Sequence, residues 1–140
     1  MQYIDIFDQL EPQERLNLMD RATVKQFSDG ETIVTQGTDN TNIYVIAEGE
    51  VQVLIEGEEG SQELARLGIG TIFGEMTYLT HGTASATVVA SGAVEALCLE
   101  HAQILAMTHE DPEFSGRFYR SLAITLAYRL RHTNRQIERG

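Results

Sequence analysis

Hydrophobic residues recur with two different periods, which divide the chain into three parts. Near the N-terminus apolar side chains have helical spacing, and Pro12 stands where the first turn of a helix tolerates proline. The next segment consists of short apolar runs separated by glycines, after which the helical period returns. The pattern therefore predicts a helical segment over 1–20, a β region over 21–100 and helices over 101–137, forming one domain over 1–140.

The β region contains short apolar runs bounded by turn residues. Strands are predicted at Thr23–Phe27, Thr32–Thr35, Asn42–Ala47, Val51–Glu56, Gln62–Leu67, Thr83–Ala90 and 93–99. Seven or eight short strands at this spacing, with no helical segment between them, indicate a closed or double-sheet antiparallel β structure.

Two helices are predicted after the β region. The first covers His101–His109 and the second runs from about Pro112 to Ile137. The long helix carries apolar residues four apart, namely Phe114, Phe118, Leu122, Leu126 and Leu130. This stripe could pack on the β region or on a second copy of the chain, and the spacing alone does not decide between the two.

Length and composition narrow the class of protein. With 140 residues, one core can bury roughly two thirds of the unfolded surface. We find no run of about 18 apolar residues that would cross a membrane and no signal peptide at the N-terminus. The single cysteine, Cys98, lies in an apolar strand and is expected to be packed rather than reactive. We expect a cytoplasmic protein.

Charge is distributed unevenly. Residues 1–116 carry 20 acidic side chains against four basic ones, a net charge of −16. Residues 117–140 carry six arginines against one glutamate, a net charge of +5. The acidic body argues against general binding of phosphate backbones. The arginines could contact nucleic acid or anionic lipid, but at this spacing they are predicted to form the solvated face of an amphipathic helix.

The segment Ile72–Leu79 carries the strongest chemical signal. It predicts a strand end, a glycine turn and a short helical turn that begins with Glu75. The first N–H groups of such a turn have no partner within it and can bind an anion, while a carboxylate can accept from a ribose hydroxyl. The segment therefore favours a sugar phosphate, although no basic side chain is evident beside it. Glu75 could also be simply the favourable acid of a first turn.

The order of elements and these motifs resemble the cyclic nucleotide-binding domain family, which includes the catabolite activator protein and protein kinase A regulatory subunits. The resemblance covers nearly the whole chain, and its landmarks are Gly30, Gly37, Gly49, Leu67–Met76 and Ser85–Val88. It implies a mainly β fold with flanking helices. The fold would be a double-stranded β-helix of jelly-roll type, with an N-terminal helix before it and a short and a long helix after it.

The resemblance also implies a ligand site. In the family, the short helix of the phosphate-binding cassette offers backbone amides and its glutamate holds the ribose 2′-hydroxyl, a role that falls to Glu75. The cassette arginine of the family is replaced here by Ala84. Losing such a charge-assisted contact should weaken cyclic nucleotide binding roughly tenfold to a thousandfold. The candidate ligand-binding residues are Phe73, Gly74, Glu75, Met76, Ala84, Ser85 and Ala86.

Two functions follow from the resemblance. The first is a non-catalytic regulatory module that binds cyclic AMP or cyclic GMP weakly, or a related ligand, and signals through the long helix. In the family that helix covers the base, and the candidates here are Leu126, Leu130, Thr133 and Asn134. The alternative is a degenerate domain that binds no cyclic nucleotide and serves in dimerisation, protein interaction or regulation of a transporter. Partners would be a second copy through the long helix, or another protein; no cofactor is expected.

Other classes fit the sequence poorly. The four histidines, His81, His101, His109 and His132, are spread over a loop and helices without a His-x-His pair, which argues against a metal enzyme. No nucleophile–base arrangement surrounds Cys98. No helix-turn-helix follows the long helix within these 140 residues, so we expect no DNA reading by that means.

Overall fold

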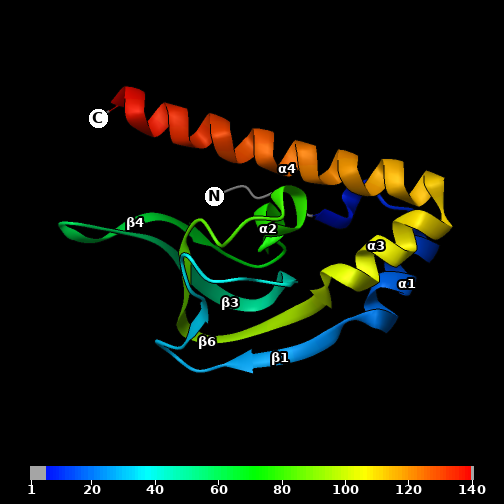
Figure 1. Ribbon diagram of the computed structural model, residues 1–140, viewed down its shortest axis with the longest axis horizontal. Coiled ribbons are helices and arrows are strands. Elements are labelled where there is room, and N and C mark those ends of the chain that lie inside the picture. Colours follow the sequence, from blue (N-terminus) through cyan, green and yellow to red (C-terminus); the bar gives the residue numbers. More distant parts are fainter. Residues whose placement is uncertain (1–5, 140) are drawn as a thin grey trace.

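The computed structural model describes the backbone of residues 6–139 and the side chains of residues 8–131. Its helices lie mostly at the two ends of the chain and its strands between them (Figure 1). The elements in order are η1 (Ile6–Gln9), α1 (Pro12–Arg21), β1 (Thr23–Phe27), β2 (Thr32–Val34), β3 (Asn42–Gly57), β4 (Gly60–Leu67), β5 (Ile72–Phe73), α2 (Glu75–Thr80), β6 (Thr87–Glu100), α3 (His101–Glu110) and α4 (Pro112–Arg139).

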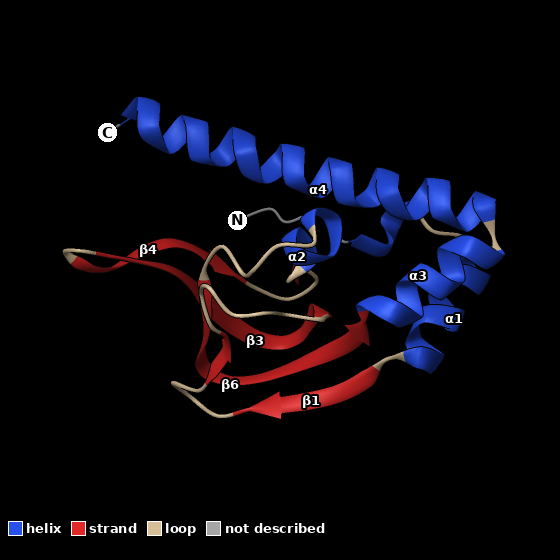
Figure 2. Cartoon of the chain, in the orientation of Figure 1, coloured by secondary structure: helices blue, strands red, loops and turns tan. Residues whose placement is uncertain are grey.

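The strands form an antiparallel sheet in the order β1-β6-β3-β4, with β2 also pairing β6 and β5 pairing β3. The two long strands β3 and β6 pair from Asn42 opposite Glu100 to Leu54 opposite Thr87. They curve through the domain, while α1 and α3 lie at one end and the β3–β4 hairpin projects at the other (Figure 2). The expected fold class, mainly β with flanking helices, is confirmed.

The strand boundaries differ from those expected. The segments 42–47 and 51–56 are one strand, and 93–99 joins a strand that begins only at Thr87. Gly49 explains the first merger: its φ is +92° and a Cβ there would lie 2.4 Å from the Ala93 carbonyl oxygen. The register shifts on both sides of Glu48. Glycine therefore bends the strand at a bulge instead of ending it.

The long helix α4 packs on the domain through the first half of its apolar stripe. Phe114, Phe118 and Leu122 are at most 2% exposed and belong to a core cluster with residues of α1, α3 and the start of β3. Burying each such side chain contributes about 1.5–3 kcal/mol. Leu130, by contrast, is 62% exposed. The stripe thus serves the domain itself in its first half only.

A second core cluster fills the interior of the strands. It contains Tyr44, Phe73, Ala84 and Cys98 together with valines and alanines of β3 and β6. The Cys98 thiol is buried as expected, and burial raises its pKa. None of the described helices is both long and apolar enough to span a membrane.

Candidate functional site

The glycine–acid turn has the predicted form. Strand β5 ends at Phe73, whose ring stacks on Tyr44 with centroids 4.9 Å apart. Gly74 follows with φ +87° and precedes α2. A Cβ at Gly74 would lie 2.5 Å from the Asn42 carbonyl oxygen, so both the conformation and the close approach require glycine. The turn places Glu75 at the first position of α2.

Glu75 is paired with an arginine from the far end of the chain. Its Oε1 lies 2.6 Å from Nη1 of Arg129 in α4. Arg129 also donates through Nη2 to the Ile72 carbonyl at the end of β5. The Glu75 side chain is 4% exposed and the Arg129 side chain 28%. One guanidinium therefore fastens α4 to both sides of the glycine turn.

This ion pair corrects two expectations. The cassette was expected to lack a basic side chain, whereas Arg129 lies beside its glutamate. The arginines of α4 were expected to be solvated, whereas Arg117 and Arg129 both pair with buried carboxylates. The missed signal is a second row of polar residues at spacing four, Arg117, Ser121, Thr125 and Arg129. Ser121 and Thr125 are buried, which shows that this row faces the domain.

The other half of the expected site lies in the loop before β6. Ala84 is buried in the same apolar cluster as Phe73, so the fold brings the two halves of the cassette to one core. Ser85 is exposed and Ala86 is half-buried. Both were predicted to lie in a strand, but both precede the start of β6. Met76 is 43% exposed on the outer side of α2. Among the proposed base-covering residues, Leu126 is half-buried and Leu130 exposed, while the side chains of Thr133 and Asn134 lie outside the described residues.

An aromatic group connects α2 to α3 and α4. The Tyr78 and Tyr119 hydroxyls are 2.8 Å apart, and the two rings are stacked. Burial and the Tyr119 hydroxyl raise the pKa of Tyr78. The His101 ring meets Tyr78 edge-on, and burial lowers the pKa of His101, so its neutral form is favoured. Small helix α2 is thus held to α4 at two points, Tyr78 and Glu75.

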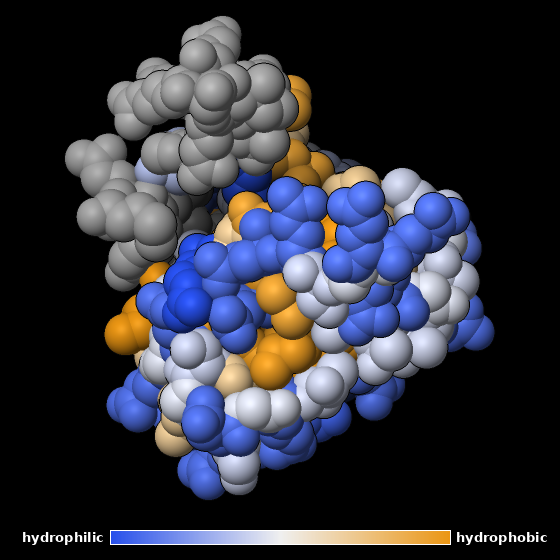
Figure 3. All heavy atoms as spheres, turned by 90° about the vertical axis from the view of Figure 1, so that its left-hand side faces the viewer, coloured by the Kyte–Doolittle hydropathy of each residue, from blue (hydrophilic) through white to orange (hydrophobic). Residues whose placement is uncertain are grey.

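The face with the projecting hairpin offers apolar surface. Figure 3 shows this face, with apolar side chains gathered at its centre between hydrophilic ones. Four half-buried apolar side chains border the interior cluster of the strands: Phe27, Ile33, Val53 and Leu67. The interior of the sheet is therefore apolar around the position at which the sequence lacks the family's phosphate-binding arginine.

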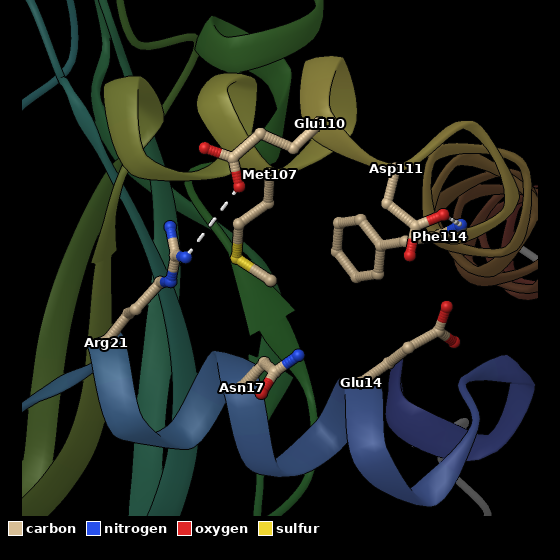
Figure 4. A pocket seen from close by; sticks show the side chains of 7 residues that line it. All are labelled: Glu14, Asn17, Arg21, Met107, Glu110, Asp111 and Phe114. Atoms are coloured by element: carbon tan, nitrogen blue, oxygen red, sulfur yellow. Dashed lines mark hydrogen bonds and ion pairs between the residues drawn. The ribbon is translucent and has the colours of Figure 1, made fainter.

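A separate small pocket lies between α1, α3 and the start of α4 (Figure 4). Its polar side chains have partners in the surrounding helices. Glu14 binds Arg117, Arg21 lies 4.0 Å from Glu110, and Asp111 accepts from the N–H groups of Glu113 and Phe114 as a helix cap. The pocket lies at a junction of three helices, and its acidic side chains make the contacts that join and cap these helices.

Fold and turn together define a β-roll domain with a glycine–acid cassette covered by a terminal helix. A family model described as the cyclic nucleotide-binding domain matches residues 24–111. The chain belongs to the cyclic nucleotide-binding domain family.

Individual relatives agree with this assignment. The chain is 38% identical over 85 residues, 61% of its length, to a cAMP-dependent protein kinase type II regulatory subunit of Drosophila melanogaster, and covers 22% of that protein. It therefore spans about a fifth of the length of this curated relative. The catabolite activator protein of Thermus thermophilus is similar in structure, with a TM-score of 0.81 and 30% identity over 96% of this chain and 62% of that one.

A third relative is a mutant protein with a bound ligand. It is the regulatory subunit of a cAMP-independent protein kinase A from Trypanosoma brucei, in a triple mutant bound to cAMP in its A site. One of the three replacements introduces an arginine for a threonine. This structure has a TM-score of 0.66 and 25% identity and covers 86% of this chain and 47% of that chain.

Proposed function

We propose that this domain is a non-catalytic regulatory module that binds a cyclic nucleotide, cyclic AMP or cyclic GMP, weakly, and signals through α4. The observation that carries the proposal is the ion pair between Glu75 and Arg129, 2.6 Å long. It joins the carboxylate that matches the family's ribose ligand to the helix that would transmit the signal. A ligand hydroxyl that binds Glu75 must share or replace this partner.

Such competition couples ligand binding to the position of α4. A ligand shifts an equilibrium between two arrangements only by its difference in affinity for them. In one arrangement Arg129 binds Glu75. In the other arrangement the ligand binds Glu75 in its place. The contact between Tyr78 and Tyr119 is a second link between the same two helices, so a movement of α2 acts directly on α4. The N-terminal half of α4 stays anchored through its buried phenylalanines, and the response is expected in the C-terminal half.

Weak binding follows from Ala84. Its side chain is buried among apolar residues and offers the ligand phosphate no charge. The Trypanosoma brucei relative supports the importance of such a group, because a cAMP-independent subunit is found bound to cAMP when its replacements include an added arginine. We therefore expect dissociation constants nearer millimolar than micromolar, since a lost charge-assisted contact costs about a hundredfold in affinity.

Isothermal titration of the chain with cyclic AMP and cyclic GMP tests the proposal. Weak heats that saturate are expected, and Ala84→Arg should raise the affinity at least tenfold. Thr83→Arg is the matched control, because it adds the same charge at an exposed neighbouring position. No heat at millimolar ligand, for the wild type and for Ala84→Arg, contradicts the proposal.

The alternative, a domain used for dimerisation, has one observation in its favour. On α4, Tyr119, Ala123, Leu126 and Leu130 follow the 4-3-4 spacing of a coiled-coil seam, which the sequence continues at Thr133 and Ile137. Tyr119 and Leu130 are 38% and 62% exposed. A second copy of the chain, with the seam of its own α4 packed against this one, would cover these residues.

Light scattering tests the dimer with substitutions on the exposed seam. Phe118 and Leu122 are unsuitable, because they belong to the core of the domain. Ala123→Glu combined with Leu130→Glu should convert a dimer to a monomer. Leu105→Glu, at an exposed position of α3 that is 47% accessible, should leave the dimer intact. A dimer that survives the double substitution excludes α4 as the contact.

A further inference from the structure

The loop between β2 and β3 contacts both halves of the cassette. On one side it holds the segment that leads into β6. The Gly37 N–H donates to the Ala84 carbonyl at 2.9 Å, and the Ala84 N–H donates to the Thr38 carbonyl at 2.9 Å. The Gln36 N–H donates to the Thr87 hydroxyl at 2.9 Å. On the loop side these three bonds use backbone groups only, so they do not depend on a particular loop side chain.

On the other side, the loop holds the glycine turn through one side chain. The Asn40 Nδ2 atom lies 2.8 Å from the Asn42 carbonyl oxygen, 3.2 Å from the Thr77 hydroxyl and 3.4 Å from the Gly74 carbonyl oxygen. The Thr77 hydroxyl donates to the Gly74 carbonyl at 3.1 Å and therefore accepts from Asn40. Three oxygen acceptors from β3, the turn and α2 converge on this one amide group.

Only a donor suits the place of the Nδ2 atom, whereas the Oδ1 atom of the same amide accepts from the Asn42 N–H at 3.3 Å. A neutral amide nitrogen has two hydrogens to share among the three acceptors, whereas a carboxylate has none and would repel them. The site is also tightly packed, because a Cβ on Gly74 would lie 2.9 Å from the Asn40 Nδ2 atom. The Asn40 side chain and the bare glycine therefore fit one another.

We propose that Asn40 is a positioning residue of the ligand site. Through its amide donor it fixes the turn Gly74–Thr77 against the start of β3, so that the loop 35–41 sets the spacing between Glu75 and Ala84. A ligand that reaches from the glutamate to the segment before β6 depends on that spacing. The consequence for the ligand rests on the proposed function; the consequence for the turn does not.

Hydrogen exchange of the backbone amides tests the effect on the turn. Asn40→Asp keeps the shape of the side chain but replaces the donor by a charged acceptor, whereas Asn40→Ala removes the group. If the donor is what matters, amides of residues 74–80 exchange at least tenfold faster in Asn40→Asp, which is affected more than Asn40→Ala. Amides of β1 keep their rates. Gln13→Glu, the same chemical change at an exposed position of α1, is the control and should leave α2 unchanged.

Two hydrogen-exchange results overturn the proposal: α2 exchange in Asn40→Asp equal to wild type, or acceleration by the same factor in every segment. Titration with cyclic AMP adds the ligand arm, and a tenfold weaker affinity in Asn40→Asp is expected. Unchanged affinity despite faster α2 exchange also overturns it. If wild-type protein binds no cyclic AMP, the proposed function fails, and hydrogen exchange alone decides the role of Asn40.

Discussion

Helix α4 is held by two ion pairs that resemble each other in bond length and burial and differ in setting. Near its start, Arg117 binds Glu14 of α1 through two contacts of 2.8 and 2.7 Å. Three turns later, Arg129 binds Glu75 of α2 at 2.6 Å. The glutamate side chains are 9% and 4% exposed and the arginine side chains 32% and 28%. Burial and bond length alone would assign the two pairs the same role.

The neighbours of the two carboxylates separate them. Glu14 also accepts from the Glu11 N–H at 2.8 Å in a capping box, and it lies beside the buried Phe114 at the junction of three helices. Glu75 begins a helix of only six residues, at the position that the resemblance matches to the family's ribose ligand. Under the proposed function, the pair within the three-helix junction stabilises the fold, whereas the pair on the six-residue α2 is exchanged for a ligand.

The largest expected effect is on stability at the first pair. Arg117→Met keeps the length of the side chain but leaves the Glu14 carboxylate buried without its charge. An uncompensated carboxylate at such a position lowers the free energy of unfolding by about 2–3 kcal/mol. Urea denaturation measures the change. Arg21→Met is the control, because Arg21 lies 4.0 Å from an exposed glutamate and should contribute less than about 1 kcal/mol. Equal losses in both variants would refute the distinction.

The second effect is acid sensitivity from the same pair. The hydrogen bond from Arg117 lowers the pKa of Glu14 below its ordinary value of 4.5. The unfolded chain therefore takes up a proton in a range of pH where the folded chain does not. The resulting stability is complete above pH 4.5 and is lost as the pH falls from there through the pKa of the folded protein.

Denaturation curves measured from pH 6 down to pH 3 show this loss as a slope of stability with pH. Glu14→Gln cannot take up the proton, so its curve should be flatter in this range, starting from a lower stability at neutral pH. Glu113→Gln is the matched control, since Glu113 contacts the same arginine at 3.9 Å but is 84% exposed. It should keep the slope of the wild type. An unchanged slope in Glu14→Gln would assign the acid sensitivity to other groups.

At the second pair we expect a smaller loss of global stability than at the first, but a larger increase in local amide exchange. Arg129→Met leaves Glu75 without its cation, yet α2 can open locally and hydrate the carboxylate without unfolding the core. We expect a loss of about 1 kcal/mol in global stability. Amide exchange should rise in α2 and in α4 beyond Leu122, and stay unchanged in α1. Equal acceleration in α1 would show that the second pair belongs to the same rigid unit as the first.

The two regions of α4 also differ in how much of their structure could be predicted from the sequence. Glycines and apolar periods predicted the elements and the cassette turn, because Gly74 and the stripe from Phe114 to Leu122 act through local conformation and burial. The pairing of Arg129 with Glu75 was not predicted, since it joins residues 54 positions apart and depends on how α4 lies over α2 (Figure 1). The merged strands were missed for a related reason: Gly49 ends a strand or bends it depending on its cross-strand neighbour Ala93. Local chemistry was predictable, and long-range contact was not.

The smallest effect concerns the contact that links the two helices beside the second pair. The Tyr78 and Tyr119 hydroxyls are 2.8 Å apart, and Tyr119→Phe removes their bond while keeping the stacked rings. A double-mutant cycle with Tyr78→Phe should give a coupling of about 0.5–1.5 kcal/mol by thermal unfolding. Ultraviolet titration gives an independent readout: because the Tyr119 hydroxyl contributes to the raised pKa of Tyr78, that pKa should move part of the way back towards 10, while burial keeps it elevated. No coupling would mean that the hydroxyl bond adds nothing to the ring stacking and the ion pair, which then connect the cassette to the terminal helix without it.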